Sequence, residues 1–259
     1  MLVKIIFLSN IQIKSIIQIL GAGGKNKHEQ IVIFSYTSRM NYRFFTNSEK
    51  TWEAMYESIS HAENSIYLEM YIFEDTVERF HFFDLLKEKA EKGIRIKLIL
   101  DAFGSMELSN NKLAELKKSG AEVLFQSYLF HRAHRKILIV DEFVAYIGGA
   151  NVHKTAQLWN DLVVRVEWVL VRNIMKSFAK SYTEAGGKDP LIVDTKNKIS
   201  LEKVNAWVVE HSPFRNIFNL RRIYQKHLNS AQKRIILVTP YFTPKRWLRA
   251  LLHQAVLRG

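Results

Sequence analysis

The feature that most restricts how this chain can fold is an internal repeat. Residues 54–73 (AMYESISHAENSIYLEMYIF) resemble residues 223–242 (IYQKHLNSAQKRIILVTPYF) without a gap, so that Ala231 corresponds to Ala62. Each copy passes from helical spacing of apolar residues into a β-branched, aromatic run, and is followed by a helical pattern that ends in glycine. A repeat of this kind predicts two copies of one helix–strand–helix unit.

The stretch between the two copies alternates strand and helix patterns, which predicts an α/β fold with a mixed, largely parallel sheet. The run KILIVDEFVAYIGG over residues 136–149 has two apolar halves around Asp141-Glu142, and it predicts a hairpin central to that sheet. The other expected elements are helices over 49–64, 82–92, 111–119 and 173–185 and strands over 65–73, 94–100, 121–125 and 162–171.

Residues 188–200 are the most polar stretch and the best candidate for a domain boundary. We therefore expect an N-terminal extension over 1–34, a complete domain over 35–200 and an incomplete second domain over 201–259. The second copy of the repeat contains only its opening helix, strand and helix, which is the basis for the last expectation. Within the extension, residues 2–20 fit an ordinary helix or strand packed on the domain better than a basic helix at a membrane interface.

Composition restricts the chemistry of the 259-residue chain. It contains no cysteine, which excludes a disulfide scaffold, a zinc–thiolate site and a cysteine nucleophile. Its formal net charge of +13 favours an anionic partner such as nucleic acid, anionic lipid or a phosphorylated small molecule. No uninterrupted run of about 18 apolar residues occurs, so a membrane-spanning helix is not expected.

The segment with the clearest chemical meaning has the pattern H-x-K-x4-D-x6-G-G-x-N. Its fixed positions are His134, Lys136, Asp141, Gly148, Gly149 and Asn151. Side chains two residues apart on a strand point the same way, so His134 and Lys136 project together. An imidazole and an ammonium group that converge on one point suit a phosphate, because the first can attack phosphorus and the second offsets oxygen charge.

The remaining polar positions have roles that follow from their surroundings. Glycines at 148 and 149 permit close backbone approach, and Asn151 can donate an amide hydrogen bond to a phosphate oxygen. Asp161 begins the next strand-like run and can orient the ring of His134. Asp141 lies at the predicted hairpin turn, where a bond from its side chain to the backbone is expected.

This segment resembles the phospholipase D superfamily, whose HKD motif it reproduces, and most of all the bacterial cardiolipin synthase branch. The phrases YLEMYIF, HRAHRKILIVDEFVAYIGGAN, WND and ILVTPYFTP carry the resemblance, which covers roughly residues 44–259. It implies a phospholipase D-like βα sandwich with one complete repeat and the beginning of a second. The departures are Asp-Glu at the turn instead of Asp-Gly, Asn160 where arginine is common, and no second HKD motif.

The resemblance implies a phosphatidyltransferase that works through a phosphohistidine intermediate and needs no metal or other cofactor. His134, Lys136, Asp161 and Asp141 then belong to the catalytic motif, and Asn151, Gly148 and Gly149 bind substrate phosphate. The implied partners are an anionic phospholipid such as phosphatidylglycerol, the membrane surface, and a second HKD half supplied in cis or in trans. The implied location is cytoplasmic with peripheral membrane association.

Alternatives remain open from the sequence. A nuclease or other phosphodiesterase of the same superfamily would use the same chemistry on nucleic acid, although the sequences of the motifs favour a lipid substrate. A third possibility is a non-catalytic half-site protein, because one motif provides half of the family's site. Glu69 either lines the site or is a buried, paired acid, and the sequence does not choose between the two. His131 and His153 are read as loop histidines, and Trp52, Trp168 and Trp207 as packing anchors.

Overall fold

The computed structural model describes residues 3–9, 12–20, 29–35, 41–75, 77, 79–126, 134–197, 206–211, 217–232, 234–238 and 242–258. The chain divides into two compact units. One comprises Met40–Glu202, and the other comprises Met1–Arg39 together with Lys203–Gly259. His131 and the side chain of Trp207 lie outside the described part, so the interpretations of those two residues stay predictions.

The unit over residues 40–202 is built on a seven-stranded sheet of order β4-β10-β9-β8-β5-β6-β7. The strands are β4 (Tyr42–Asn47), β5 (Ser65–Met70), β6 (Arg95–Asp101), β7 (Glu122–Gln126), β8 (Lys136–Val140), β9 (Val144–Gly148) and β10 (Asn160–Glu167). The sheet is mixed, as predicted, and the β8–β9 hairpin adjoins its centre. It is not largely parallel, because only the β5–β6 and β6–β7 pairs are parallel. The other four pairs are antiparallel, since β8 returns against β5 and starts a meander through β9 and β10 to β4.

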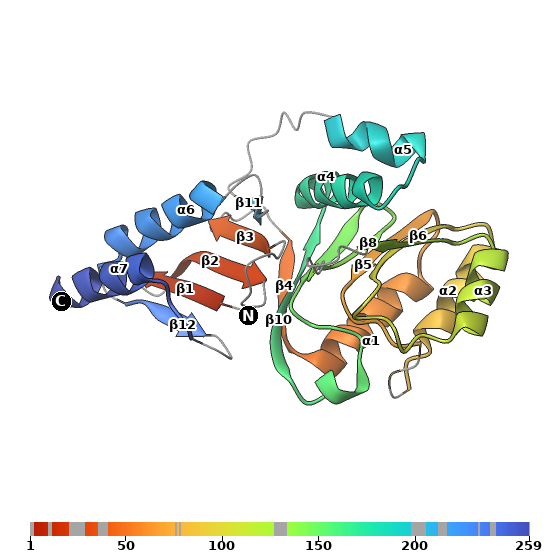
Figure 1. The fold of residues 1–259 in the computed structure, drawn as a ribbon, viewed down its shortest axis with the longest axis horizontal. Coiled ribbons are helices and arrows are strands. Elements are labelled where there is room, and N and C mark those ends of the chain that lie inside the picture. The colour runs from red at the N-terminus through yellow and green to blue at the C-terminus, as the bar shows by residue number, and fades with distance from the viewer. Residues whose placement is uncertain are drawn as a thin grey trace. The chain divides into compact units, whose positions relative to one another are not determined.

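Helices cover both faces of this sheet (Figure 1). One layer contains α1 (Ser48–Ser60), α2 (Phe82–Glu91) and α3 (Asn110–Lys118), and the other contains α4 (Val169–Glu184) with the short α5 (Pro190–Val193) beside it. Two 3₁₀ turns, η1 (Lys154–Ala156) and η2 (Asp194–Asn197), complete the unit. The result is a sheet buried between two helical layers, the α/β sandwich that the sequence predicts.

The ends of the helices follow from local sequence. The side chain of Asn47 caps α1 by accepting a hydrogen bond of 3.0 Å from the backbone N–H of Lys50. Gly93, Gly120 and Gly186 follow α2, α3 and α4 with φ angles of 84°, 104° and 92°. These angles lie in the left-handed region that favours glycine, so the predicted helix ends are confirmed.

The two faces of β5 have different chemistry. Ile66, Leu68 and Met70 belong to the apolar core shared with α1 and α2. On the opposite face Tyr67 stacks on Phe178 of α4 with ring centroids 5.5 Å apart. Glu69 on that face is 1% exposed, and its carboxylate lies 3.2 Å from Nε of Arg135.

Arg135 also donates hydrogen bonds to the hydroxyls of Ser177 and Ser181 on α4. Glu69 is therefore a buried, paired acid under α4. The pair and its serine partners join β5, the residue before β8 and α4 in one buried polar contact.

Removing one member of this pair should be costly. We expect Arg135→Ala to lower the free energy of unfolding by about 3–5 kcal/mol, because it leaves a buried carboxylate without its cation. The double variant Glu69→Leu/Arg135→Met should lose much less, since no charge remains to be desolvated. Urea unfolding followed by circular dichroism measures both. A loss below about 1 kcal/mol for Arg135→Ala would show that the pair does not hold α4 on the sheet.

The second unit carries the second copy of the repeat. It contains α6 (Ile217–Ser230), β12 (Ile236–Val238) and α7 (Arg246–Leu257), in the same order as α1, β5 and α2. Arg258 donates to the carbonyl of Leu228 at 2.7 Å, and its counterpart in the repeat, Lys89, donates to the carbonyl of Ala62 at 3.1 Å. In both copies a cation near the end of the second helix donates to a backbone carbonyl near the end of the first helix, Leu228 within the last turn of α6 and Ala62 two residues after α1.

The sheet of this unit has the order β11-β3-β2-β1-β12, with all neighbours antiparallel. Its other strands are β1 (Val3–Ser9), β2 (Gln12–Leu20), β3 (Glu29–Ser35) and β11 (Ala206–His211). Beside β12 the N-terminal strands thus take the order that β8, β9 and β10 take beside β5. No helix in the described part of the chain is long and apolar enough to cross a membrane.

Candidate active site

The HKD histidine and lysine meet at one edge of the seven-stranded sheet. His134 immediately precedes β8, and Lys136 opens that strand opposite Met70, the last residue of β5. Lys136 is 3% exposed, and its Nζ donates to the carbonyl oxygen of His134 at 3.1 Å. The structure therefore brings the two predicted residues together, with the ammonium group held inside the protein.

Tyr71 links these two residues and was not anticipated from the sequence. Its ring centroid lies 4.6 Å from that of His134, and Nζ of Lys136 lies over the same ring at 4.9 Å from its centroid. An ammonium group over an aromatic face is attracted by the ring quadrupole. The available signal was position, because Tyr71 directly follows a strand whose neighbour begins with the motif lysine.

Asn151 is held at the same edge by two hydrogen bonds and by a β-bridge of the next residue. The backbone N–H of Ile72 donates to its side-chain oxygen at 3.3 Å, and the indole N–H of Trp52 donates to its backbone carbonyl at 2.9 Å. Val152 forms a parallel bridge with Phe73. Because the amide oxygen accepts from Ile72, the amide NH2 of Asn151 is the end available as a donor. Trp52 is fully buried, as expected of a packing anchor.

Gly148 and Gly149 leave room for the neighbouring strand β10. A Cβ atom on Gly148 would overlap the backbone of Leu162 and Val163, and one on Gly149 would overlap the carboxylate of Asp161. The same carboxylate accepts from the N–H of Leu162 at 2.7 Å. Asp161 thus lies against Gly149. Because Gly149 is two residues before Asn151, Asp161 lies at the same end of these strands as Asn151.

Asp141 lies elsewhere. It follows the far end of β8, so roughly 20 Å of extended chain separates it from His134. Its carboxylate accepts hydrogen bonds from the backbone N–H groups of Glu63, Asn64 and Ser65 at 3.0, 2.7 and 2.8 Å. The expected bond from side chain to backbone is present, and it ties the hairpin to the start of β5.

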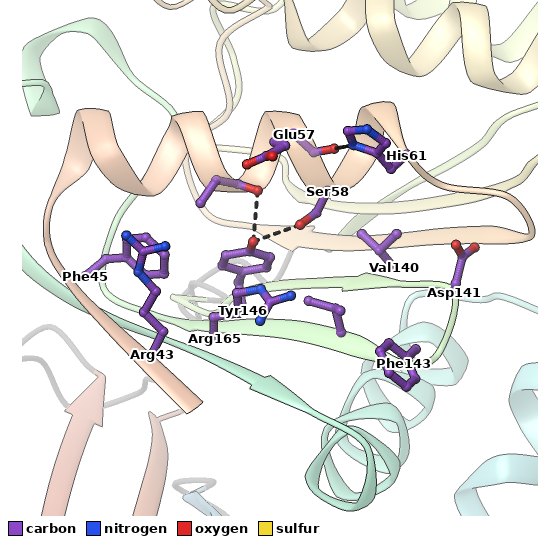
Figure 2. Close-up of a pocket in the computed structure, with 12 residues that line it drawn as sticks. Arg43, Phe45, Glu57, Ser58, His61, Val140, Asp141, Phe143, Tyr146 and Arg165 are labelled. Atoms are coloured by element: carbon purple, nitrogen blue, oxygen red, sulfur yellow. Dashed lines mark hydrogen bonds between the residues drawn. The ribbon is translucent and has the colours of Figure 1, made fainter. Parts of the chain in front are cut away.

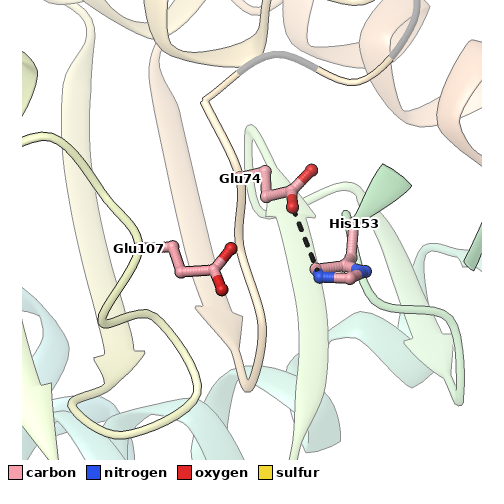
Figure 3. A group of neighbouring side chains, drawn as sticks. All are labelled: Glu74, Glu107 and His153. Atoms are coloured by element: carbon pink, nitrogen blue, oxygen red, sulfur yellow. Dashed lines mark ion pairs between the residues drawn. The ribbon is translucent and has the colours of Figure 1, made fainter. Parts of the chain in front are cut away.

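A carboxylate and histidine cluster flanks the site (Figure 3). Ligand atoms of Glu74, Glu107 and His153 lie within 4.8 Å of one another. Nδ1 of His153 accepts from the backbone N–H of Thr155 at 3.2 Å, so the ring proton belongs on Nε2, which faces Glu74 at 3.3 Å. A metal ion would need the lone pair of Nε2, and this tautomer does not present it.

The same glutamate also accepts from the backbone N–H of Lys154 at 2.9 Å. Glu74 therefore holds residues 153 and 154 in place through its side-chain contact with His153 and its hydrogen bond from Lys154, and these residues directly follow the Asn151 segment. The observed role of the cluster is to fasten the chain after β9 to the chain after β5.

Comparison with known proteins gives one family. Residues 55–182 match the family described as "Cardiolipin synthase, PLD-like domain". The chain is 25% identical over 241 residues to the probable cardiolipin synthase YwiE of Bacillus subtilis. The alignment covers 86% of this chain and 48% of that protein. It is 28% identical over 241 residues to a cardiolipin synthase of Oceanobacillus iheyensis, at 86% and 50% coverage. The chain thus spans about half the length of these curated relatives.

Among solved structures, the phospholipase D family member Nuc from Salmonella typhimurium aligns with a TM-score of 0.47 and 19% identity, covering 56% of this chain and 95% of Nuc. Together with the HKD motif at the sheet edge, the family match defines the class. The domain that contains residues 55–182 belongs to the phospholipase D superfamily of enzymes. Within that superfamily it falls in the cardiolipin synthase-like branch.

The contact between Gly149 and Asp161 yields a prediction. Gly149→Ala should lower the free energy of unfolding by about 1–3 kcal/mol, because the new methyl group must displace the Asp161 carboxylate or shift β10. Adding Asp161→Ala should recover part of that loss by removing the group that the methyl meets. A double-mutant cycle in urea measures the coupling, and strictly additive losses would contradict the contact.

The Asp141 clamp yields another. Asp141→Ala removes an acceptor shared by three backbone N–H groups, and we expect it to lower the free energy of unfolding by about 2 kcal/mol. Asp141→Asn keeps one acceptor oxygen and should lose less. Thermal unfolding of the two variants and the parent chain gives the comparison. Equal stability of all three would mean that the clamp contributes nothing to the fold.

Proposed function

We propose that this chain supplies one half-site of a phosphatidyltransferase of cardiolipin synthase type, which acts on phospholipid phosphodiesters. The observation that carries the proposal is the joint placement of His134 and Lys136 on Tyr71 where β5 ends and β8 begins, in a domain that matches this family. The net charge of +13 supports an anionic substrate such as phosphatidylglycerol, presented at a membrane surface with which the protein associates peripherally.

The proposed first step is attack of His134 on phosphorus. A nitrogen–phosphorus bond forms, the bond from phosphorus to the leaving alcohol breaks, and a second histidine gives that alcohol its proton. In the second step this histidine removes a proton from the acceptor hydroxyl. The acceptor oxygen then attacks phosphorus and releases His134. No metal ion or other cofactor enters either step.

The other residues at the edge have supporting roles in this proposal. The ammonium group of Lys136 offsets the charge that grows on the phosphoryl oxygens, and the amide NH2 of Asn151 donates to one of them. Asp161 orients the imidazole, and the small residues Gly148 and Gly149 let β10 bring that carboxylate in. Asp141 acts at a distance by fixing the register of β8.

The mechanism needs a second histidine at the site, which a second HKD half must supply in cis or in trans. A single imidazole cannot hold phosphorus and protonate the leaving group in the same step. The curated relatives are about twice as long as this chain, which is consistent with two halves in one polypeptide. We therefore expect little or no turnover by the 259-residue chain alone.

The test uses phosphatidylglycerol vesicles and labelled DNA in parallel. The chain is assayed alone and after addition of the C-terminal half of a cardiolipin synthase relative, expressed separately. Cardiolipin should form only in the mixture, and His134→Ala should reduce its rate by at least about a thousandfold. Lys118→Gln, an exposed change on α3, is the matched control and should leave the rate unchanged.

Three outcomes would contradict the proposal. Cleavage of DNA in preference to lipid would favour a nuclease of the same superfamily. Lipid turnover that His134→Ala leaves intact would remove the assigned nucleophile. A mixture that binds vesicles but stays inactive on both substrates would support the non-catalytic alternative.

A further inference from the structure

A pocket lies far from His134, at the other end of the β8–β9 hairpin (Figure 2). Its volume is about 500 Å3, within the range of pockets that bind small molecules. Helix α1 forms one wall, and β4, β9 and β10 form the other. The charged and aromatic side chains that line the pocket include Arg43, Phe45, Glu57, Asp141, Tyr146 and Arg165.

Two arginines face each other across neighbouring strands in this pocket. Arg43 on β4 is the direct cross-strand partner of Arg165 on β10. Like charges placed directly opposite each other destabilise a sheet unless something lies between them to neutralise them. Arg165 has such a group, because it forms an ion pair with Glu167. The guanidinium of Arg43 lies 4.9 Å from the ring centroid of Phe45, and no carboxylate of the described residues pairs with it.

The acids near the arginines are mostly engaged. The carboxylate of Asp141 accepts three backbone N–H groups, and Glu167 accepts from the amide of Asn41 at 2.6 Å in addition to its pair with Arg165. Glu57 on α1 is the exception, since its side chain is exposed at the rim and its hydrogen bonds to described residues, from Ser60 and His61, go to its backbone carbonyl. Of the two lining acids, Glu57 therefore opposes an incoming anion more strongly than Asp141, whose charge is partly offset by three backbone N–H groups.

The floor between the arginines and α1 is uncharged. The hydroxyl of Tyr146 donates to the carbonyl of Ala54 at 2.8 Å and lies 2.8 Å from the hydroxyl of Ser58. Burial raises the pKa of Tyr146, so the phenol stays neutral at physiological pH. With Phe45 it gives the pocket an aromatic side next to a cationic one.

We propose that this pocket is a second binding site, which takes a phosphate group carried on a small apolar body. Arg43 and Arg165 hold the phosphate between them, and Phe45 and Tyr146 contact the apolar part. A bound phosphate relieves the repulsion that Glu167 leaves between the two guanidinium groups, and it gives Arg43 a counterion that no carboxylate of the described residues provides. The phosphate can come from a soluble phosphomonoester or from a phospholipid headgroup, since both present the same oxygens.

The experiment monitors the guanidinium Nε–Hε resonances of Arg43 and Arg165 by NMR, which separates this pocket from phosphate bound near His134. Phenyl phosphate is the soluble probe, because it carries a phosphate on a small apolar body. Sedimentation with phosphatidylglycerol vesicles is the lipid arm. We expect both resonances to shift with phenyl phosphate if the source is soluble. If the source is lipid, we expect vesicle binding that depends on Arg43 without such shifts.

The variants use matched changes of charge. Arg43→Gln should weaken binding of the effective probe about tenfold or more, and Glu57→Gln should strengthen it severalfold by removing the opposing acid. Lys118→Gln removes one positive charge outside the pocket and is the control for net charge. Arg43 and Glu57 are exposed, so both variants should fold, and their thermal unfolding verifies this.

Equal binding by Arg43→Gln and Lys118→Gln would overturn the proposal, because the effect would then be one of net charge. So would weaker binding by Glu57→Gln, or no response to either probe at millimolar concentration. These outcomes do not depend on turnover at His134, so the proposal stands or fails separately from the proposed activity.

Discussion

The candidate active site depends on the antiparallel pairing of β5 with β8. In the observed register Met70 lies opposite Lys136 and Glu69 lies opposite Ile137. Side chains alternate between the two faces of a strand, so a slip of one residue would exchange the faces of Arg135 and Lys136. Arg135 would leave its buried carboxylate under α4, and Lys136 would leave Tyr71. Two adjacent cations with different partners therefore specify the register more strongly than apolar alternation alone does.

Both ends of β8 are fixed by polar contacts, and each contact serves a different need. At the far end the Asp141 carboxylate gathers three backbone N–H groups at the start of β5. At the near end Tyr71 touches His134 and Lys136, while Asn151 accepts from Ile72 one residue further along. The contacts of Asp141 align β8 with β5, and the contacts of Tyr71 form only when the two strands are aligned in this way. Asp141 and His134 belong to one motif because they are the two ends of a single positioned strand.

The sequence predicts what local interactions decide. Asn47 and the glycines at 93, 120 and 186 mark helix ends through their own backbone preferences, and the hairpin follows from Asp141-Glu142 between two apolar runs. Strand direction was predicted less well, because whether β8 meets β5 in parallel or antiparallel depends on pairing between distant segments. Tyr71 was missed for the same reason, since its contact with His134 exists only once β5 and β8 are side by side. The Arg43–Arg165 pair is likewise a product of strand pairing and has no signature in either local sequence.

The geometry of a single half-site explains why the proposed chemistry is divided between two. His134 is held by contacts on the side of its own domain, where Tyr71 packs on the ring and Nδ1 is buried. An incoming phosphate must then approach from the open edge of the sheet, and in-line attack places the leaving oxygen on the side of phosphorus away from His134. The proton that this oxygen needs must come from beyond the reach of the domain that holds the nucleophile. In the proposed mechanism a second half that faces the same strand ends supplies this proton from the required direction.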